Sequence, residues 1–189
     1  ARSHDSRRTN CTPFNRWPET AVDTEVYRGH VFIMQAALIR SHGGLDAIDI
    51  ESVAEPVAKP MESIIRVEAC AINHMDLWAR KGVATYSYPL PLIPGCDIAG
   101  TIVESNRLPA GTEVIVAPGI SCGVCTECLA GRDNLCKQYG IFGETRNGGC
   151  AEFVAVPDVN LIPKPSSLSW SAAAAFPLTF LTAWHMLVT

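Results

Sequence analysis

The chain has 189 residues, of which 48% are hydrophobic and 18% charged, and its formal net charge is −4. This apolar content can build a buried core and excludes wholesale disorder. The slight acidic excess leaves no long basic stripe for phosphates, which argues against a nucleic-acid-binding protein. The 14 glycines and 13 prolines instead predict many turns between short strands.

The predicted elements follow an N-terminal extension, residues 1–33. Its early arginines are typical of a transit peptide, but the acidic residues that follow argue against one. A short helix at 74–81 is expected to end at Gly82 in the left-handed conformation. Residues 170–188 are predicted to be helical in two pieces around Pro177. Alternating apolar residues predict strands at 34–40, 47–53, 62–71, 98–104, 112–117 and 151–156.

The order of these elements predicts a mainly β fold. Short strands followed by a long helix indicate a small β-barrel at 34–168, with the helix at 169–189 connecting it to another domain. In the longest strand, alternation along its whole length would give one face the residues Ile65, Val67, Ala69 and Ala71.

Residues 165–189 contain no Asp, Glu, Lys or Arg, over a length greater than the ~20 residues that cross a bilayer. Pro177 interrupts this stretch, and Ser, Thr and His are distributed through it. We therefore interpret it as an Ala-rich helix buried against another domain, and we expect no membrane association.

The eight cysteines are the strongest compositional signal. Four of them fall within fifteen residues, and the others, Cys11, Cys70, Cys96 and Cys150, are scattered. A secreted disulfide framework would be more evenly spread and would usually follow a signal peptide. We therefore expect a reducing compartment, the cytoplasm, with the scattered thiols acting as small core residues.

The clustered cysteines lie in a loop-rich lobe at 118–149 and are spaced as Cys122-x2-Cys125-x2-Cys128-x7-Cys136. Four thiolates at this spacing can surround a tetrahedral zinc and leave no position for substrate, which is typical of a structural site. An iron–sulfur cluster is the chemical alternative. However, the bacterial ferredoxin run has three residues before its fourth cysteine and a proline after it.

Several motifs resemble the medium-chain, zinc-containing alcohol dehydrogenase and quinone oxidoreductase superfamily. The loop-rich segment at 118–149, with its four cysteines, is similar to the structural-zinc loop of this superfamily. The resemblance extends over about four-fifths of the chain. Its other motifs are Asn-His-Met-Asp-Leu-Trp at 73–78, Pro-Gly-Cys-Asp-Ile-Ala-Gly at 94–100, Gly-Cys-Ala-Glu-Phe at 149–153 and Leu-Thr-Phe-Leu-Thr-Ala-Trp at 178–184.

This resemblance implies a GroES-like catalytic domain followed by a Rossmann domain that binds NAD(P)H. No Gly-x-Gly-x-x-Gly follows a strand in this sequence, so the coenzyme domain is expected beyond Thr189 and the chain to be an inactive part of a longer enzyme. The matching positions make His74 and Thr182 candidate coenzyme contacts. The full-length enzyme would act on a small molecule and form a homo-oligomer.

The chain departs from the family pattern where the catalytic zinc would be held. The positions that match its three ligands carry Asn73, Cys96 and Leu178. Catalytic zinc needs three protein ligands and an open position, and only one thiolate is offered here. An alternative site built from Cys96, His74, Asp97 and Cys70 would instead make a two-zinc alcohol dehydrogenase with unusual ligands.

Without that zinc, reduction of a quinone, enone or carbonyl is easier than oxidation of a simple alcohol. Delocalisation spreads the developing charge, and hydrogen-bond donors can hold the oxyanion. The resemblance to zinc-independent reductases makes Asn73 such a donor, and Asp76 a second catalytic candidate or a partner of a nearby base or backbone amide. A non-enzymatic, zinc-stabilised binding domain is the alternative from another functional class, and a zinc-ribbon nucleic-acid binder is disfavoured by the net charge.

Overall fold

The computed structural model describes residues 32–188, so almost all of the expected extension at 1–33, and Thr189, lie outside the described residues. The described part divides into two compact units. The main unit comprises residues 32–120 and 140–188. The second unit, which we call the cysteine lobe, is Ser121–Tyr139, inserted in the sequence between two short strands.

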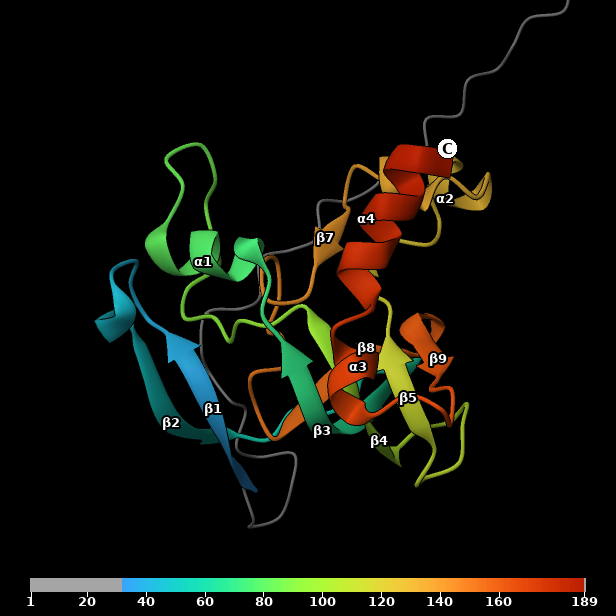
Figure 1. The fold of residues 1–189 in the computed structure, drawn as a ribbon, viewed down its shortest axis with the longest axis horizontal. Coiled ribbons are helices and arrows are strands. Elements are labelled where there is room, and N and C mark those ends of the chain that lie inside the picture. Colours follow the sequence, from blue (N-terminus) through green and yellow to red (C-terminus); the bar gives the residue numbers. More distant parts are fainter. Residues whose placement is uncertain (1–31, 189) are drawn as a thin grey trace, which may run out of the picture. The chain divides into compact units, whose positions relative to one another are not determined.

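The main unit is built on a five-stranded antiparallel sheet in the order β8-β3-β4-β5-β9 (Figure 1). Strands β1 and β2 form an antiparallel pair, and so do β6 and β7. Isolated bridges from Ala36 to Ala151 and from Ile39 to Leu92 connect β1 to other segments. The strands are β1 (Ile33–Ile39), β2 (Ile48–Ala54), β3 (Glu62–Ala71), β4 (Asp97–Glu104), β5 (Glu113–Val116), β6 (Gly119–Ile120), β7 (Gly140–Ile141), β8 (Phe153–Pro157) and β9 (Leu161–Pro163).

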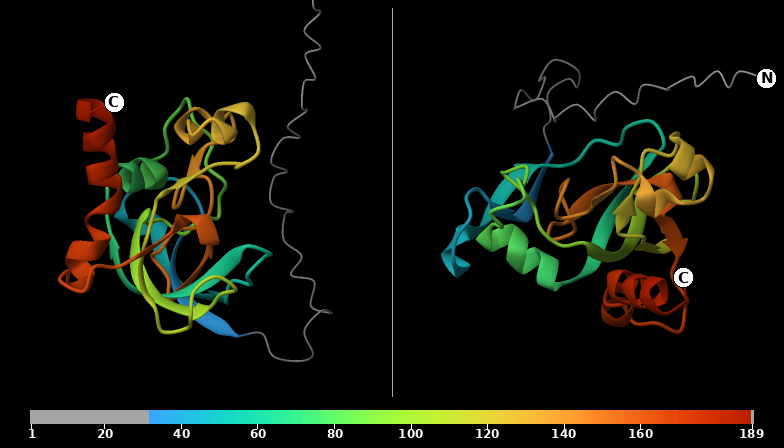
Figure 2. Two further views of the ribbon diagram at one scale, coloured as in Figure 1. Left: turned by 90° about the vertical axis from the view of Figure 1, so that its right-hand side faces the viewer. Right: turned by 90° about the horizontal axis from the view of Figure 1, so that it is seen from above.

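The helices of the main unit are α1 (His74–Lys81), α3 (Trp170–Ala174) and α4 (Pro177–Val188). Helix α2 (Thr126–Leu129) belongs to the cysteine lobe. Single 3-10 turns lie at η1 (Leu45–Ala47), η2 (Asp133–Leu135) and η3 (Asp158–Asn160). Helices α3 and α4 lie on the same side of the five-stranded sheet and pack against β4 (Figure 2).

The alternation expected along β3 is wrong after Val67. The β3–β4 register shifts between Val67 and Ala69, so a β-bulge reverses which side chains face which way. Ile65 and Val67 pack in the main core, whereas Ala69 packs on the other side, in a cluster with α3. The bulge also turns the Cys70 side chain into the main core.

β-Branched side chains fill most of the main core. Strands with one covered face favour such residues because they pack well on a pleated surface. Phe142, between β7 and β8 in the sequence, is the largest fully buried side chain. The other core members include Ile65, Ile98, Ile102, Val114, Val116, Val154 and Val156.

Local signals account for the helix ends. Gly82 follows α1 with φ 79° and ψ 150°, so it has the positive φ expected of glycine but not the left-handed helical ψ. The Ser169 hydroxyl accepts a hydrogen bond from the Ala172 N–H and caps α3. Helix α4 begins at Pro177, a position where a missing N–H costs nothing. The prediction of two helical pieces around Pro177 is therefore confirmed.

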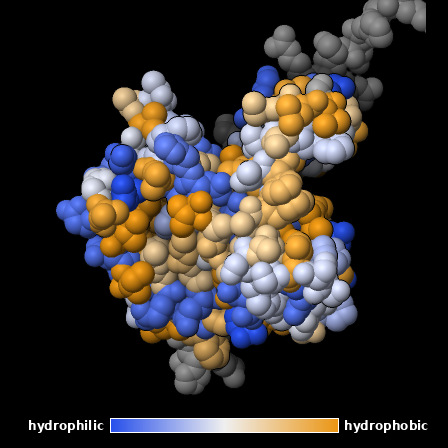
Figure 3. Space-filling view, viewed as in Figure 1, coloured by the Kyte–Doolittle hydropathy of each residue, from blue (hydrophilic) through white to orange (hydrophobic). Residues whose placement is uncertain are grey.

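Helix α4 exposes a large apolar surface, and hydrophobic side chains cover its visible side (Figure 3). The exposed residues are Phe180, Leu181, Trp184, Met186, Leu187 and Val188. In the part of the chain that the structure describes, no helix is long and apolar enough to cross a membrane.

Candidate functional site

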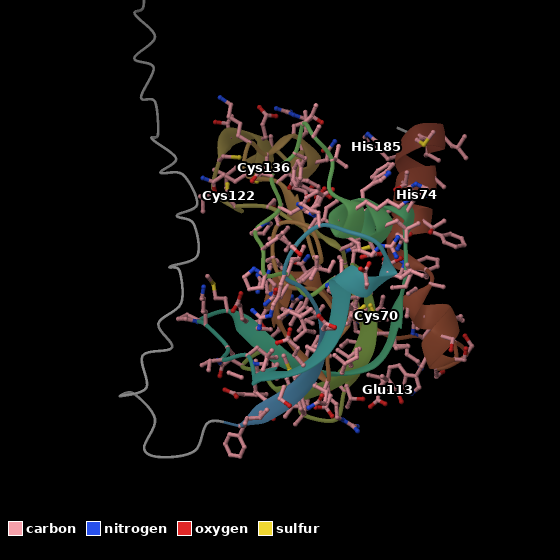
Figure 4. The ribbon with its side chains drawn as sticks, turned by 90° about the vertical axis from the view of Figure 1, so that its left-hand side faces the viewer. Cys70, His74, Glu113, Cys122, Cys136 and His185 are labelled. Atoms are coloured by element: carbon pink, nitrogen blue, oxygen red, sulfur yellow. The ribbon has the colours of Figure 1, made fainter. Side chains whose placement is uncertain are left out.

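The cysteine lobe brings its four thiols together. The sulfur atoms of Cys122, Cys125, Cys128 and Cys136 all lie within 4.8 Å of one another. Cys128 Sγ is 3.9 Å from Cys122 Sγ and 3.5 Å from Cys125 Sγ. Four sulfurs ~2.3 Å from a central zinc would lie ~3.8 Å apart. The arrangement therefore fits a tetrahedral zinc, and Figure 4 shows Cys122 and Cys136 in the same lobe.

The lobe lowers the pKa of Cys122 and Cys128, which favours the thiolate form that binds zinc, although the neighbouring thiols raise the pKa of Cys125 to about 11. Backbone N–H groups of Val124 and Cys125 lower the pKa of Cys122 to about 6. Cys125 immediately precedes α2, and Cys128 lies within this single helical turn. The turn therefore places both sulfur atoms on the same side of the helix. Little else could stabilise the lobe, because Cys136 is its single buried hydrophobic residue. A metal would supply the stability that apolar packing does not.

A second polar cluster lies at the start of β4, in the main unit. The side-chain amide of Asn73 donates hydrogen bonds to Asp97 Oδ2 over 2.8 Å and to Cys96 Sγ over 3.3 Å. Cys96 and Asp97 are both almost completely buried. The N–H of Leu178 donates to Asp97 Oδ1 over 2.8 Å, which ties the first turn of α4 to β4.

Asp76 holds the backbone on either side of this cluster. Its Oδ2 accepts a hydrogen bond from the Asn73 N–H over 2.7 Å, in the manner of a capping box at the start of α1. Its Oδ1 accepts from the Gly95 N–H over 2.8 Å. Both carboxylate oxygens of Asp76 are thus used to fix the two segments that carry Asn73 and Cys96.

Burial perturbs the ionisable groups of the cluster. Loss of solvent raises the pKa of Asp97, although hydrogen bonds from Asn73 and Leu178 oppose the rise. Loss of solvent likewise raises the pKa of Asp76 against its bonds from Asn73 and Gly95. Burial and the neighbouring carboxyls raise the pKa of Cys96 to about 12, so this thiol stays protonated near neutral pH.

This donor set does not fit a catalytic zinc. Asn73 offers an amide, whose N–H groups face the other two side chains, and Leu178 offers only its backbone N–H, so Cys96 is the one usual zinc ligand among the three positions. Within residues 32–188, the lobe cysteines are the one group of three or more His, Cys, Asp or Glu side chains whose ligand atoms converge. His74 and Cys70 do not join Cys96 and Asp97 in such a group.

Comparison with known proteins identifies the fold. Residues 59–166 match the family described as the alcohol dehydrogenase GroES-like domain. The chain belongs to this family. The mainly β, GroES-like fold and the superfamily expected from the sequence are therefore confirmed.

Similar proteins in this family are dehydrogenases. An L-threonine 3-dehydrogenase of Rhizobium etli is 33% identical over 149 residues, 76% of this chain and 43% of its own length. The crystal structure of an NAD-dependent alcohol dehydrogenase is 46% identical, with a TM-score of 0.79, over 82% of this chain and 46% of the other. A thermostable alcohol dehydrogenase from Pyrobaculum aerophilum is 32% identical, with a TM-score of 0.75, over 82% of this chain and 47% of the other. It has also been solved with cobalt and zinc bound. The chain thus spans less than half the length of these relatives.

The two candidate coenzyme contacts are both exposed, His74 on the GroES-like domain and Thr182 on the helix that follows it. His74 is exposed at the first residue of α1 (Figure 4), where its ring lies edge-on to Trp78 at 4.9 Å. Thr182 is exposed on α4. Neither side chain takes part in the hydrogen bonds among Asn73, Cys96 and Asp97.

Sequence reasoning did not find the acceptor role of Asp97 in this GroES-like domain. From the sequence, Asp97 was a candidate only for the alternative metal site with Cys96, His74 and Cys70. The signal that could have revealed the role is the amide at Asn73, since an amide beside a buried acid favours a hydrogen bond over a metal. The contribution of the Leu178 backbone could not be read from side-chain identities.

Proposed function

We propose that this chain is the catalytic-domain portion of an NAD(P)H-dependent oxidoreductase that reduces an enone, a quinone or another activated carbonyl. The observation that carries the proposal is the Asn73 side chain, which donates to Cys96 and Asp97 at the position where alcohol-oxidising relatives would hold zinc. The family and its NAD-dependent dehydrogenase relatives support the reaction class. The acceptor preference rests on the donor chemistry alone.

The cysteine lobe would hold one structural zinc through Cys122, Cys125, Cys128 and Cys136. Zinc with four sulfur ligands has no open position, so it braces the fold and takes no part in turnover. The convergence of the four sulfurs supports this role.

Asn73 can donate to a substrate oxygen without leaving Asp97. Its hydrogen bond to the Cys96 sulfur is the weaker of the two, because sulfur is a poor acceptor. A carbonyl oxygen that gains negative charge would compete for that hydrogen, while the bond to Asp97 keeps the amide in place. Asp76 acts as a positioning residue, since both of its oxygens hold backbone N–H groups.

The coenzyme would reach this site from a further domain. When bound, the nicotinamide supplies the hydride for the reduction. Exposure of His74 and Thr182 leaves both side chains available to contact the coenzyme. The small-molecule substrate would then lie between the nicotinamide and Asn73.

The test is a set of assays on the enzyme expressed with its coenzyme-binding domain. NADH and NADPH oxidation would be followed with enones, quinones and simple aldehydes, and the reverse reaction with simple alcohols. We expect turnover of the conjugated acceptors, and a loss of about 10²-fold or more in kcat for Asn73→Ala. Asn106→Ala, at an exposed position, is the control and should leave the rate unchanged. No measurable turnover with any acceptor would overturn the proposal. A preference for simple alcohols, together with two zincs per chain, would overturn it as well.

A further inference from the structure

Two cysteines outside both sites face each other across neighbouring strands. The Sγ atoms of Cys70, on β3, and Cys150, which precedes β8, lie 3.8 Å apart and share a hydrogen bond. Antiparallel pairing of β3 with β8 brings them together, and the Val67 N–H bond to the Glu152 carbonyl, at 2.9 Å, extends that pairing towards them. Cys70 lies in the interior of the main unit in Figure 4.

Cys150 is the member of the pair that borders a surface pocket. Cys150 lines a surface pocket of about 310 Å³ together with Val67, Glu152 and residues of β1 and β2. Both cysteines are only partly buried. Cys70 does not line this pocket, so a small oxidant such as a hydroperoxide would meet Cys150 first.

The pocket distinguishes the two thiols, because Cys150 lines it and Cys70 does not, and the direction of their pKa shifts agrees with this order. The hydrogen bond lowers the pKa of Cys150, because the Cys70 S–H can donate to a Cys150 thiolate. The same bond, together with burial, raises the pKa of Cys70. The thiolate is the nucleophilic form of cysteine, so the residue at the pocket is also the one better able to react.

We propose that Cys150 and Cys70 form a reversible dithiol–disulfide site that reacts with hydroperoxides. The Cys150 thiolate attacks the oxygen of the peroxide that carries hydrogen, the O–O bond breaks, and a sulfenic acid forms on Cys150. The expelled alkoxide or hydroxide takes up from solvent the proton that the Cys150 thiol had released, and it leaves as an alcohol or water. The Cys70 sulfur then attacks the Cys150 sulfur, the S–O bond breaks, and the hydroxyl leaves as water with the Cys70 proton. The two thiols lose two electrons to the peroxide, and a small-molecule thiol reverses the change.

The geometry is compatible with this bond. The sulfurs start 3.8 Å apart and a disulfide requires ~2.05 Å, so the bond needs a closure of roughly 1.8 Å. Gly95 has no side chain, and this leaves room for the sulfur atoms of both Cys70 and Cys150. A Cβ at this residue would lie 2.5 Å from Cys70 Sγ and 2.8 Å from Cys150 Sγ. The site is independent of the proposed reductase activity, since neither cysteine bonds to Asn73, Cys96 or Asp97.

The experiment is peroxide titration of the zinc-loaded protein, followed by peptide mapping with mass spectrometry under non-reducing conditions. We expect a linked peptide pair that contains Cys70 and Cys150, and its disappearance after treatment with dithiothreitol. In Cys70→Ser, a dimedone-type probe should trap a sulfenic acid on Cys150. In Cys150→Ser, the same probe should leave Cys70 unlabelled.

Cys96→Ser is the matched control, because Cys96 is a neighbouring buried cysteine outside the pair. Its linked Cys70–Cys150 peptides should form as in the unaltered protein. Circular dichroism of each variant would check its fold, and the result on the unaltered protein does not depend on any substitution. The proposal is overturned if Cys70 and Cys150 stay reduced at peroxide concentrations that leave zinc bound, or if Cys150 links instead to Cys96.

Discussion

The side-chain amide of Asn73 lies 2.8 Å from the buried carboxylate of Asp97 and donates a hydrogen bond to it. The other oxygen of the same carboxylate accepts from the Leu178 backbone. One acidic group therefore joins the residue before α1, the start of β4 and the start of α4. The stability of the domain and the chemistry of its candidate site depend on the same contact.

Replacing Asn73 by Ala should destabilise the main unit. The change removes a donor from the buried Asp97 carboxylate and from Cys96, and an unsatisfied buried polar group costs ~1–3 kcal/mol. Urea unfolding followed by circular dichroism measures the effect. Asn106→Ala, at an exposed position, should stay within ~0.5 kcal/mol of the unaltered protein. Equal effects of the two substitutions would mean that the Asn73 bonds contribute nothing to folding.

Asp97 should make the domain less stable as the pH rises. Burial raises its pKa in the folded state above the ordinary value of 3.8, so between these two values the folded protein binds more protons than the unfolded chain. The free energy of unfolding therefore falls as the pH increases through this window. Asp97→Asn should flatten the fall, measured by unfolding in urea from about pH 4 to about pH 7. Asp76, whose pKa is also raised, would retain a part of the slope. Parallel pH profiles for the two proteins would contradict this prediction.

The strands could be predicted from the sequence because each has a strong local pattern. β3 and α1 begin and end where the pattern places them, and β1, β2, β4, β5 and β8 agree within two residues. The short strands β6, β7 and β9 could not be predicted. Two or three residues carry too little periodicity, and their pairing depends on distant segments.

The bulge in β3 explains why the alternation expected along this strand places Ala69 and Cys70 on the wrong faces. A register shift after Val67 depends on how β3 pairs with β4, which alternation along one strand cannot reveal. The shift brings Cys70 into the main core and against Cys150, a contact that the expectation of small core residues did not include. The cysteine lobe was different, because metal-ligand spacing is local and its four sulfurs converge as the spacing indicates.

A methyl group at Gly95 should be much more damaging than one at Gly111. Both residues have positive φ, 99° and 86°, so the backbone strain of an Ala substitution is similar. The added carbon at Gly95 would lie 2.5 Å from Cys70 Sγ, whereas at Gly111 nothing lies within 4 Å. We expect Gly95→Ala to cost ~1–3 kcal/mol more than Gly111→Ala in urea unfolding. A difference close to zero would show that the sulfurs move aside freely.

Removal of zinc should unfold the cysteine lobe and leave the main unit folded. The lobe has little buried apolar surface, whereas the main unit has its own hydrophobic core. Limited proteolysis after treatment with a strong chelator should cut within Ser121–Tyr139, and added zinc should restore protection. Cuts that begin in β3 or β4 would contradict the prediction.

Zinc content per chain, measured by elemental analysis of the purified protein, tests the division between the two sites most directly. We predict one zinc per chain, lost in Cys128→Ser and retained in Cys96→Ser. Two zincs in the unaltered protein, or loss of zinc on replacing Cys96, would contradict the assignment of Asn73, Cys96 and Asp97 to a metal-free hydrogen-bonded cluster.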